Sequence, residues 1–426
     1  MQPSRAISDR TESSDGSGPP PEAATGPRWL SVVGIGEDGV DGLGAAARAA
    51  IAGAAVVFGG RRHLALARPL VAGEARPWPT PFDTAVAAVA ALRGRPICVL
   101  ASGDPFQHGV GATLARRIGA EEMTVIPAAS AFGLAAARLG WALQEVETIS
   151  LHGRAEALVR PLLHPGTRIL ALTSDGAAPA RIARRLVEAG FGASRLHVLE
   201  AMGGPRERRL TARAADFGEA ACAELNLLAV EVEGGAEAAV LPLAGLDDAL
   251  FEHDGQITKR EVRAVTLAAL APRRGELLWD VGAGSGSVAI EWLLRHPSLR
   301  AVAVEARPDR AARIRRNAEA LGAPGLEVRE GAAPAALAGL PPPDAIFLGG
   351  GGTDPGVLEA VIAKLPAGGR LVANAVTLAM QARLTEAAGR LGGDLVALSV
   401  ARAAPVGAMT AWRPALPVVQ WSWVKR

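Results

Sequence analysis

The segment 276–292, ELLWDVGAGSGSVAIEW, constrains the fold of this chain more than any other part of the sequence. Its first residues are apolar, which is typical of a buried parallel strand, and the strand is expected to end at Asp280. Glycines follow at alternate positions, and the periodic apolar residues after them predict a helix. Strand, glycine turn and helix open a doubly wound α/β unit, which binds ligands beyond the carboxyl ends of its strands. We therefore expect a ligand site at this turn.

The spacing of the glycines indicates which ligand the turn binds. A dinucleotide fingerprint has the spacing G-x-G-x-x-G, but Ser287 stands at the place of the third glycine, and the spacing here is G-x-G-x-G. The next expected strand, 301–304, ends in Glu305, and an acid at that position can accept hydrogen bonds from the ribose of an adenosine. These features resemble the class I S-adenosylmethionine-dependent methyltransferases. A generic nucleotide-binding unit is the alternative.

The composition is that of an α/β protein with large cores. Hydrophobic residues make up 49% of the 426 residues and charged residues 21%, and this length leaves room for two domains. With 45 Lys and Arg residues against 43 Asp and Glu residues, the net charge of +2 creates no field that would recruit nucleic acid or a membrane. We therefore expect a small molecule as the substrate, with neither nucleic acid nor membrane as a partner.

Targeting segments and metal sites are not expected. No apolar run is long enough to span a bilayer, and residues 1–27 lack the apolar core of a signal peptide, so we expect a disordered tail and a cytoplasmic protein. Cys98 and Cys222 stand far apart in apolar runs typical of strands, which predicts two buried thiols in a reducing compartment. The 7 histidines show no ligand-like spacing, so no metal is expected.

The region before the glycine turn carries small-residue loops at the ends of several expected strands. Residues 34–39, GIGEDG, match the letters of a dinucleotide fingerprint. The strand that follows, 55–58, ends in two glycines and has no acid at its tip, so a dinucleotide would lack its ribose anchor. A nicotinamide-dependent oxidoreductase is therefore an alternative that the loops do not favour.

Taken together, these loops resemble the tetrapyrrole methylase family, the class III methyltransferases. The matching motifs are VVGIG at 32–36, FGGRRHL at 58–64, SGDPF at 102–106, SLHGR at 150–154 and MGGPRER at 202–208. The last two are the more specific and resemble the members that methylate C5 of a cobalamin precursor. The resemblance implies a cofactor folded between two α/β lobes and held by Gly36, Gly103, Asp104, Pro105, Ser130 and Ala131. Glu37, where proline is common, and Ala128, where glycine is usual, depart from the family pattern.

The C-terminal half resembles the C15-methylating, decarboxylating enzymes of the same pathway. The matching motifs are ITKREVR at 257–263, WDVGAGSGSV at 279–288, PPPDAIFLGG at 341–350, NAVT at 374–377 and VAR at 400–402. The resemblance implies a second cofactor site formed by Thr258, Asp280, Gly282, Ala283, Gly284, Ser285, Gly286, Glu305, Gly331 and Ala332. Family members usually have an acid where Ala332 stands. Thr258 is also expected to cap a helix, 259–270, with Glu261 completing a capping box.

The predicted fold is therefore α/β in two parts. A two-lobed class III tetrapyrrole methylase fold at 28–234 is followed by a linker at 235–249 and a class I Rossmann-like methyltransferase at 250–426. The second part is expected to have a mostly parallel sheet with an antiparallel edge, formed by strands 395–402 and 418–424. The order of the two parts resembles a fusion of the two cobalamin-pathway methyltransferases.

The resemblance implies methylation of a precorrin-6-type precursor at C5 and C15, with decarboxylation of the C12 acetate side chain and one S-adenosylmethionine per domain. Methyl transfer from a sulfonium to carbon is an in-line displacement that needs no metal, and positioning can supply about 7–11 kcal/mol of its barrier. A substrate with many carboxylates calls for arginine forks. The candidates are Arg206, Arg208, Arg209, Lys259, Arg260, Arg402 and Arg413, with Glu207 and Asn374 as further catalytic hypotheses. We also expect a homo-oligomer. A methyltransferase for another acceptor, or a chain with one catalytically silent half, is the alternative.

Overall fold

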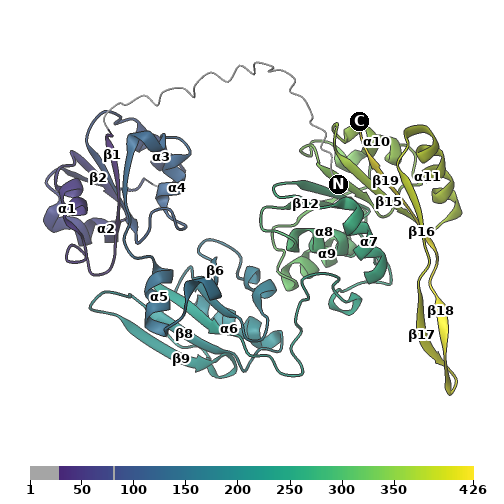
Figure 1. Ribbon diagram of the computed structural model, residues 1–426, viewed down its shortest axis with the longest axis horizontal. Helices are drawn as coiled ribbons and strands as arrows, with labels where there is room; N and C mark the ends of the chain where they lie inside the picture. The colour runs from purple at the N-terminus through teal and green to yellow at the C-terminus, as the bar shows by residue number, and fades with distance from the viewer. Residues whose placement is uncertain (1–27, 80–81) are drawn as a thin grey trace, which may run out of the picture. The chain divides into compact units, whose positions relative to one another are not determined.

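The computed structural model describes residues 28–79 and 82–426, so the predicted tail, 1–27, lies outside the described residues. The chain forms two compact units. One contains the described residues up to Arg138 together with Ala201–Glu207, and the other contains Leu139–Glu200 and Arg208–Arg426. Figure 1 labels the main helices and strands of both units.

The first unit is built on a five-stranded parallel sheet in the order β3-β2-β4-β1-β5. Alternate residues of its central strands face two apolar cores, one on each side of the sheet, which explains the near-continuous apolar runs that predict these strands. The strands are Leu30–Ile35 (β1), Val56–Gly59 (β2), Glu74–Pro77 (β3), Ile97–Ser102 (β4) and Met123–Ile126 (β5). The helices are Ala45–Ala52 (α1), Arg61–Ala67 (α2), Ala85–Ala90 (α3), Val110–Ala115 (α4) and Ala131–Leu139 (α5).

The second unit begins with a mixed sheet in the order β6-β7-β10-β8-β9. Its strands are Glu147–Ser150 (β6), Arg168–Leu172 (β7), Arg195–Glu200 (β8), Arg208–Arg213 (β9) and Asn226–Glu231 (β10). Helix α6 (Ala178–Glu188) packs its apolar face on this sheet. The last strand in sequence, β10, lies in the centre and pairs antiparallel with β7 and β8. Its residues 226–230 are buried, and Leu228 and Val230 belong to the core that includes α6.

The C-terminal part of this unit is a seven-stranded sheet in the order β13-β12-β11-β14-β15-β19-β16. The strands β13 to β15 in that order are parallel, and β19 pairs antiparallel with both β15 and β16. The strands are Leu277–Val281 (β11), Arg300–Glu305 (β12), Glu327–Glu330 (β13), Ala345–Leu348 (β14), Arg370–Ala375 (β15), Asp394–Leu398 (β16) and Val418–Val424 (β19). The predicted fold class, mostly parallel with an antiparallel edge, is confirmed.

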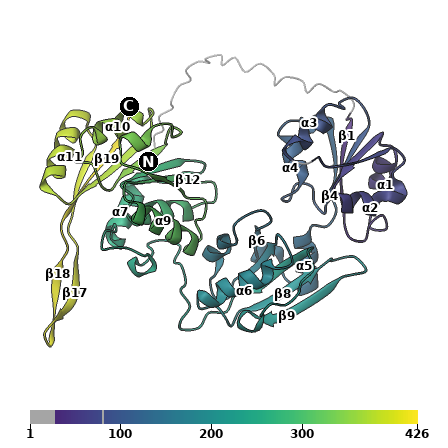
Figure 2. The same ribbon diagram turned by 180° about the vertical axis from the view of Figure 1, so that it is seen from behind.

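Helices cover both faces of this sheet. One core contains residues of α7 (Arg260–Leu270), α8 (Ser287–Leu294) and α9 (Pro308–Ala320), and the opposite core contains residues of α10 (Val357–Lys364) and α11 (Leu378–Leu391). Strands β17 (Ala401–Val406) and β18 (Met409–Pro414) form a separate hairpin. The hairpin extends away from the sheet in both views (Figures 1 and 2). Short 3₁₀ segments are Arg68–Leu70, Phe82–Thr84, Ala120–Glu122, Leu143–Glu145, Glu156–Leu162, Ala214–Asp216, Asp248–Leu250 and Ala335–Leu337.

Three local predictions are wrong. Helix α7 begins after Lys259, whose side chain makes no capping hydrogen bond, so Thr258 is not the N-cap and the predicted capping box does not form. Cys222 lies outside the strands and is only partly buried, whereas Cys98 is buried in β4 as predicted. The predicted strand 395–402 ends at Leu398, because the chain leaves the sheet there and enters the hairpin.

Within the described part of the chain, no helix is long and apolar enough to cross a membrane. The same residues contain no group of His, Cys, Asp and Glu side chains that could hold a metal ion.

Candidate functional site

The glycine turn after β11 adopts a backbone that requires glycine. Gly282, Gly284 and Gly286 have φ angles of +72°, +61° and +76°. A Cβ on Gly282 would lie 2.6 Å from the backbone of Gly350, and a Cβ on Gly286 would lie 2.8 Å from the Ile314 side chain. The turn folds against the end of the neighbouring strand, since the backbone N–H of Gly282 donates to Val304 O at 2.9 Å. Loops following β11 and β14 therefore meet at the carboxyl edge of the sheet.

Glu305, at the tip of β12, holds this turn in place. Its Oε2 accepts the backbone N–H of Gly284 at 2.9 Å, and its Oε1 accepts the N–H of Arg307 at 3.0 Å. The residue is 5% exposed. Each carboxylate oxygen has a further lone pair, so Glu305 can order the turn and still accept hydrogen bonds from a ligand. The structure thus brings the predicted strand-tip acid to the glycine turn.

Asp280 is a second buried acid at the base of the turn. Its Oδ2 accepts the N–H of Ala289 at 3.1 Å. Its Oδ1 is buried and, among the described residues, has no hydrogen-bond partner. Burial raises the pKa of the Asp280 carboxyl to about 7, and the Glu305 carboxylate adds to the rise. A carboxyl so poorly solvated favours its neutral form unless a donor or a positive charge approaches it.

These features fit an adenosyl cofactor. The three glycines adopt positive φ angles and carry no Cβ that would cover the backbone of the turn. The hydroxyl of Ser285 is buried and, like Asp280 Oδ1, lacks a partner within the described chain, so the turn keeps unused polar atoms for a ligand. Positively charged ligand atoms are favoured here because two acids lie at the turn.

The remaining predicted residues of this site lie around the turn. Gly331 follows β13, and its N–H donates to the backbone carbonyl of Glu305 at 2.9 Å. Ala332 is exposed and offers no polar side-chain contact. The segment before α7 approaches from the other side, because a Cβ on Gly284 would lie 3.4 Å from the carbonyl oxygen of Gln256. Thr258 is half-buried two residues further along this segment.

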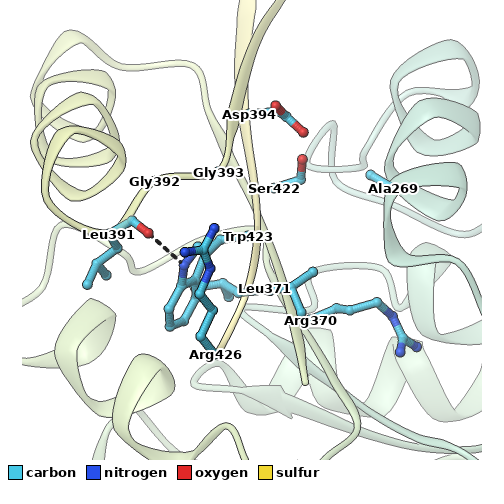
Figure 3. Close-up of a pocket in the computed structure, with 11 residues that line it drawn as sticks. Ala269, Arg370, Leu371, Leu391, Gly392, Gly393, Asp394, Ser422, Trp423 and Arg426 are labelled. Carbon is cyan, nitrogen blue, oxygen red and sulfur yellow. Dashed lines mark hydrogen bonds between the residues drawn. The ribbon is translucent and has the colours of Figure 1, made fainter. Parts of the chain in front are cut away.

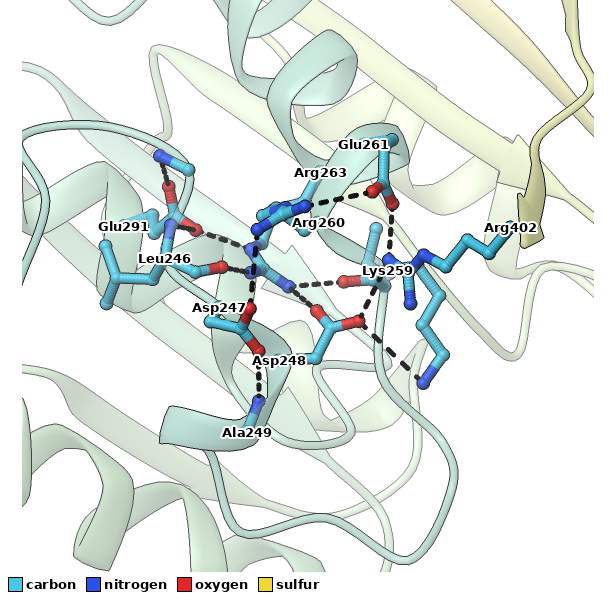
Figure 4. Close-up of polar contacts among 12 residues, drawn as sticks. Leu246, Asp247, Asp248, Ala249, Lys259, Arg260, Glu261, Arg263, Glu291 and Arg402 are labelled. Atoms are coloured by element: carbon cyan, nitrogen blue, oxygen red, sulfur yellow. Dashed lines mark hydrogen bonds and ion pairs between the residues drawn. The ribbon is translucent and has the colours of Figure 1, made fainter. Parts of the chain in front are cut away.

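Arg263 of α7 ends the ITKREVR motif but was not among the predicted site residues, and its contacts, drawn in Figure 4, anchor the segment before α7. It is fully buried, and its Nε donates to Glu291 of α8 at 2.6 Å. Its Nη1 donates to Asp248 at 3.1 Å and to the Thr258 carbonyl at 2.5 Å, and its Nη2 donates to the Leu246 carbonyl. One signal was available: Arg263 lies at helical spacing from the buried residues of α7, on the face where an arginine needs partners.

Asn374 lies at the same edge of the sheet. Ala373 pairs with Leu348, so Asn374 is level with the glycines that follow β14. Its Nδ2 donates to Thr266 Oγ1 at 2.9 Å, and its Oδ1 accepts from Gln420 Nε2 at 2.9 Å. Gln420 also donates to Thr266 at 3.0 Å. These contacts fix the orientation of the amide and leave one of the two Nδ2 hydrogens for another acceptor.

The predicted cationic residues of the C-terminal part gather near the base of the hairpin (Figure 4). Arg402 pairs with Glu261 at 2.5 Å and with Asp248 at 3.7 Å. Lys259 lies 3.9 Å from Asp248, and Arg260 lies 3.3 Å from Asp247. Arg413 is the cross-strand neighbour of Arg402 and is exposed.

In the first unit, the loops after β1, β4 and β5 pack together. A Cβ on Gly34 would lie 1.9 Å from the carbonyl oxygen of Gly103, and Gly103 itself has a φ of +54°. The Gly103 carbonyl accepts the N–H of Ala128 at 3.2 Å. Asp104 Oδ1 accepts the N–H of Phe106 at 2.8 Å, which closes the turn that contains Pro105. Three predicted cofactor residues therefore lie beside the loop that carries Ser130.

The start of α5 completes this edge. Ser130 Oγ accepts the N–H of Gly133 at 3.1 Å, so Ser130 caps the helix that begins at Ala131. A Cβ on Gly103 would lie 3.0 Å from Ser130 Cα. Gly36 lies at the end of β1, where a Cβ would meet the Asp38 side chain at 2.6 Å.

Glu207 is held as a carboxylate. Arg138 forms a two-point contact with it at 2.7 and 2.9 Å, and the N–H of Gly203 donates to its Oε2 at 2.6 Å. The hydrogen bonds from Arg138 and Gly203 lower the pKa of Glu207 to about 2. A carboxylate stabilised in this way is a weak proton acceptor.

Three predicted arginines follow Glu207 or precede it in the same motif. Arg206 lies 3.6 Å from Glu37 and is largely exposed. Arg208 pairs with the buried Glu200 at 2.6 Å, and Arg209 lies 2.9 Å from His197 Nδ1. The Arg206 side chain is 80% exposed, against 53% for that of Arg208.

A cavity of about 580 Å³ lies at the opposite edge of the seven-stranded sheet (Figure 3). It is bounded by Arg370 at the start of β15 and by Trp423 and Arg426 at the C-terminal end. The two Nη atoms of Arg370 donate to the carboxylate of Glu276 at 3.0 and 2.5 Å. Because β15 starts here, the cavity is at the amino edge of the parallel strands and is not part of the cofactor site.

Comparisons with known proteins identify the family of each half of the chain. Residues 30–218 match the family of tetrapyrrole (corrin/porphyrin) methylases, and residues 249–425 match the precorrin methyltransferase domain. A precorrin-6Y C(5,15)-methyltransferase [decarboxylating] of Sinorhizobium sp is 60% identical over 93% of this chain and 96% of its own length. The protein of that name from Mycobacterium tuberculosis (strain CDC 1551 / Oshkosh) is 45% identical over 93% of this chain and 100% of its own. The solved C-terminal domain of the Rhodobacter capsulatus protein is 46% identical and covers 43% of this chain and 100% of its own, with a TM-score of 0.42.

Fold and glycine-lined edges together define a two-part S-adenosylmethionine-dependent methyltransferase. The two halves occur in one order and over nearly the full length of the relatives. The chain belongs to the precorrin-6Y C(5,15)-methyltransferase (decarboxylating) family.

Proposed function

We propose that this chain methylates a precorrin-6-type precursor of cobalamin at C5 and C15 and removes carbon dioxide from the C12 acetate side chain. The observation that carries the proposal is the 60% identity to a decarboxylating C(5,15)-methyltransferase over 93% of the chain, which spans both halves. S-adenosylmethionine, when bound, supplies a methyl group activated by a sulfonium. We assign one such cofactor to each of two domains, 28–234 and 250–426, joined by a linker at 235–249.

At the C-terminal site, we assign cofactor binding to the glycine turn and its two acids. In this proposal the backbone of the turn 282–286 contacts the ligand, and Glu305, which already orders the turn, accepts ribose hydroxyls. Asp280 supplies a buried carboxyl whose raised pKa falls again when a cation lies near it. Thr258, Gly331 and Ala332 surround the same turn. Ala332 replaces the acid usual in the family, so the adenine side of this site has one polar contact fewer.

Asn374 is our candidate for contact with the substrate at C15. The contacts to Thr266 and Gln420 fix its amide and leave one N–H free, and it lies at the carboxyl edge beside the glycines after β14. The Asn374 amide is neutral, so its N–H can donate to a substrate carboxylate or carbonyl without the side chain taking up or losing a proton. Decarboxylation needs an electron sink, and the conjugated macrocycle itself supplies one. Arg402 would orient substrate carboxylates at the hairpin base.

At the N-terminal site, we assign cofactor binding to Gly36, Gly103–Pro105 and the Ser130–Ala131 helix start. The loops after β1, β4 and β5 meet at this edge, where the backbones of Gly34 and Gly103 lie in close contact. Glu207 is better suited to hold its loop than to accept a proton, because its pKa is lowered to about 2. In this proposal it is a positioning residue.

A mass-spectrometric assay tests the function. The full-length protein is incubated with the reduced tetrapyrrole precursor and S-adenosylmethionine, and the product mass is followed. We expect a gain of two methyl groups and the loss of one carbon dioxide. A single methyl with carbon dioxide lost would make the N-terminal half silent, and no change with the cofactor bound would assign the chain to another acceptor.

We further propose that the protein is a cytoplasmic homo-oligomer. The hairpin β17–β18 is largely exposed yet carries large apolar residues, with Met409 and Trp412 about three-quarters exposed. Such residues on an isolated hairpin suit contact with a second copy. Cys98 and Cys222 are free thiols, as in reducing compartments. Sedimentation of the full chain, with and without Trp412→Ser, tests the oligomer.

A further inference from the structure

A polar cluster at the N-terminal site has no role so far. Its members come from three neighbouring strands of the first unit, β2, β4 and β1, at their carboxyl ends. Arg62 and His63 follow β2 in the GGRRHL segment, Ser102 ends β4, and Glu37 follows β1. Ser102 directly precedes Gly103, so the cluster adjoins the loop assigned to the cofactor.

Arg62 is the centre of this cluster. Its Nη1 donates to Glu37 Oε1, and its Nη2 donates to His63 Nε2 at 2.8 Å and to Ser102 Oγ at 2.9 Å. These are three of the five N–H groups of a guanidinium, so two remain for a ligand. The Arg62 side chain is 35% exposed while that of Glu37 is 9% exposed. The ion pair thus has its acid inside and its arginine toward the surface.

His63 supports the arginine and is not a proton acceptor. Burial lowers the pKa of His63 to about 4, and the charge of Arg62 lowers it further in the same direction. His63 Nε2 lies 2.8 Å from Arg62 Nη2 and 2.8 Å from Ser102 Oγ, so its lone pair is already engaged. Accepting from Arg62 places the proton of the neutral ring on Nδ1, which is buried and has no hydrogen-bond partner among the described residues. A base would need that lone pair free. The cluster therefore holds the Arg62 guanidinium in place.

Two arginines of this cluster share one carboxylate. Glu37 is shared by Arg62 and by Arg206, whose guanidinium lies 3.6 Å away and is 80% exposed. Of the acids in the adjoining loops, Asp104 accepts the N–H of Phe106 through its Oδ1, and the Asp38 carboxylate lies beside Gly36 and Gly42. Two arginines on one carboxylate, beside an exposed serine hydroxyl, present a surface that attracts anions.

We propose that Arg62, with Ser102 and Arg206, binds a side-chain carboxylate of the tetrapyrrole at the C5-methylating site, and that Glu37 and His63 are positioning residues for Arg62. The inference rests on the proposed function. It gives a specific role to Glu37, which replaces a proline common in the family, because this carboxylate fixes the fork of Arg62. An arginine held from three sides loses little freedom when a carboxylate binds.

Steady-state kinetics of C5 methylation by the full-length protein test the inference. Arg62→Ala should raise the KM for the precursor roughly 10- to 100-fold, as expected for loss of a charge-assisted contact. The affinity of both cofactor sites for S-adenosylhomocysteine, measured by calorimetry, and methylation at C15 should stay unchanged. Arg61→Ala is the matched control, since Arg61 is the exposed neighbour in the same segment and should behave as wild type.

Two further variants separate positioning from folding. His63→Gln keeps an acceptor for Arg62 and should retain most of the wild-type KM, whereas His63→Leu should raise the KM without changing the cofactor affinity. Added methylguanidinium should partly restore the KM of Arg62→Ala. An unchanged KM in Arg62→Ala, or a loss confined to kcat or to cofactor affinity, would overturn the inference. If the wild type adds no methyl at C5, the proposed function of this half fails together with it.

Discussion

Replacing Arg263 by alanine should destabilise the C-terminal part of the chain strongly. Arg263 is fully buried against Glu291, which is 1% exposed, and it also binds two backbone carbonyls and stacks 4.9 Å from the Phe251 ring centroid. Without Arg263 the buried Glu291 keeps, among the described residues, only two backbone N–H donors and Arg295 at 3.7 Å. Loss of one partner of a buried ion pair costs about 3–5 kcal/mol. For a domain of this size, each kcal/mol shifts Tm by roughly 2–4 °C, so the expected fall is roughly 6–20 °C.

Thermal and urea unfolding of the full chain measure this loss. Arg260→Ala is the control: its side chain is 47% exposed and its ion pair with Asp247 is 3.3 Å long, so we expect a loss of less than about 1 kcal/mol. If the buried charge is the cause, Arg263→Met combined with Glu291→Gln should be more stable than Arg263→Met alone. A loss below about 1 kcal/mol in Arg263→Ala, or a double variant less stable than the single one, would refute this reasoning.

Three further variants test the C-terminal site. Burial raises the pKa of Asp280 from its ordinary 3.8 to about 7 in the folded state. The stability that the Asp280 carboxyl contributes is therefore complete below about pH 4 and is lost as the pH rises through 7. Asp280→Asn should flatten this pH dependence of the unfolding free energy in urea titrations, and an unchanged slope would contradict the assignment. Glu305→Ala should weaken S-adenosylhomocysteine binding at the C-terminal site roughly 10- to 100-fold in calorimetry, and equal weakening at the proposed N-terminal site would argue against a local role. Asn374→Ala should slow C15 methylation and carbon dioxide loss about tenfold or more with C5 methylation intact; normal turnover would dismiss Asn374.

The architecture was predictable wherever a local pattern decides the structure. The run before Asp280, the alternating glycines and the acid at the next strand tip are set by strand burial and by backbone angles that only glycine adopts easily. The antiparallel edge formed by 418–424 followed from the same apolar pattern. The central position of β10 could not be predicted from the apolar pattern, because the order of strands in the sequence says little about which strands become neighbours in a mixed sheet.

The polar part of the site depends on contacts between residues far apart in the chain. Arg402 and Glu261 are 141 positions apart, and the pair exists only because the hairpin base returns to the start of α7. The roles of Arg263 and Arg62 depend on how far each is buried and on ion-pair partners from other elements. Thr258 had the letters of a capping box, yet the chain packs its carbonyl on Arg263 and begins the helix later. Tertiary contacts overrode the local preference there.

The most direct test of the account is to follow where the methyl groups go. The full-length protein is incubated with the precursor and S-adenosylmethionine carrying a ¹³C-labelled methyl group, and the product is analysed by NMR and mass spectrometry. We predict two labelled methyl groups, on C5 and C15, and a methyl group at C12 where the acetate has lost carbon dioxide. Label at other positions, or a product that keeps the C12 acetate, would contradict the account.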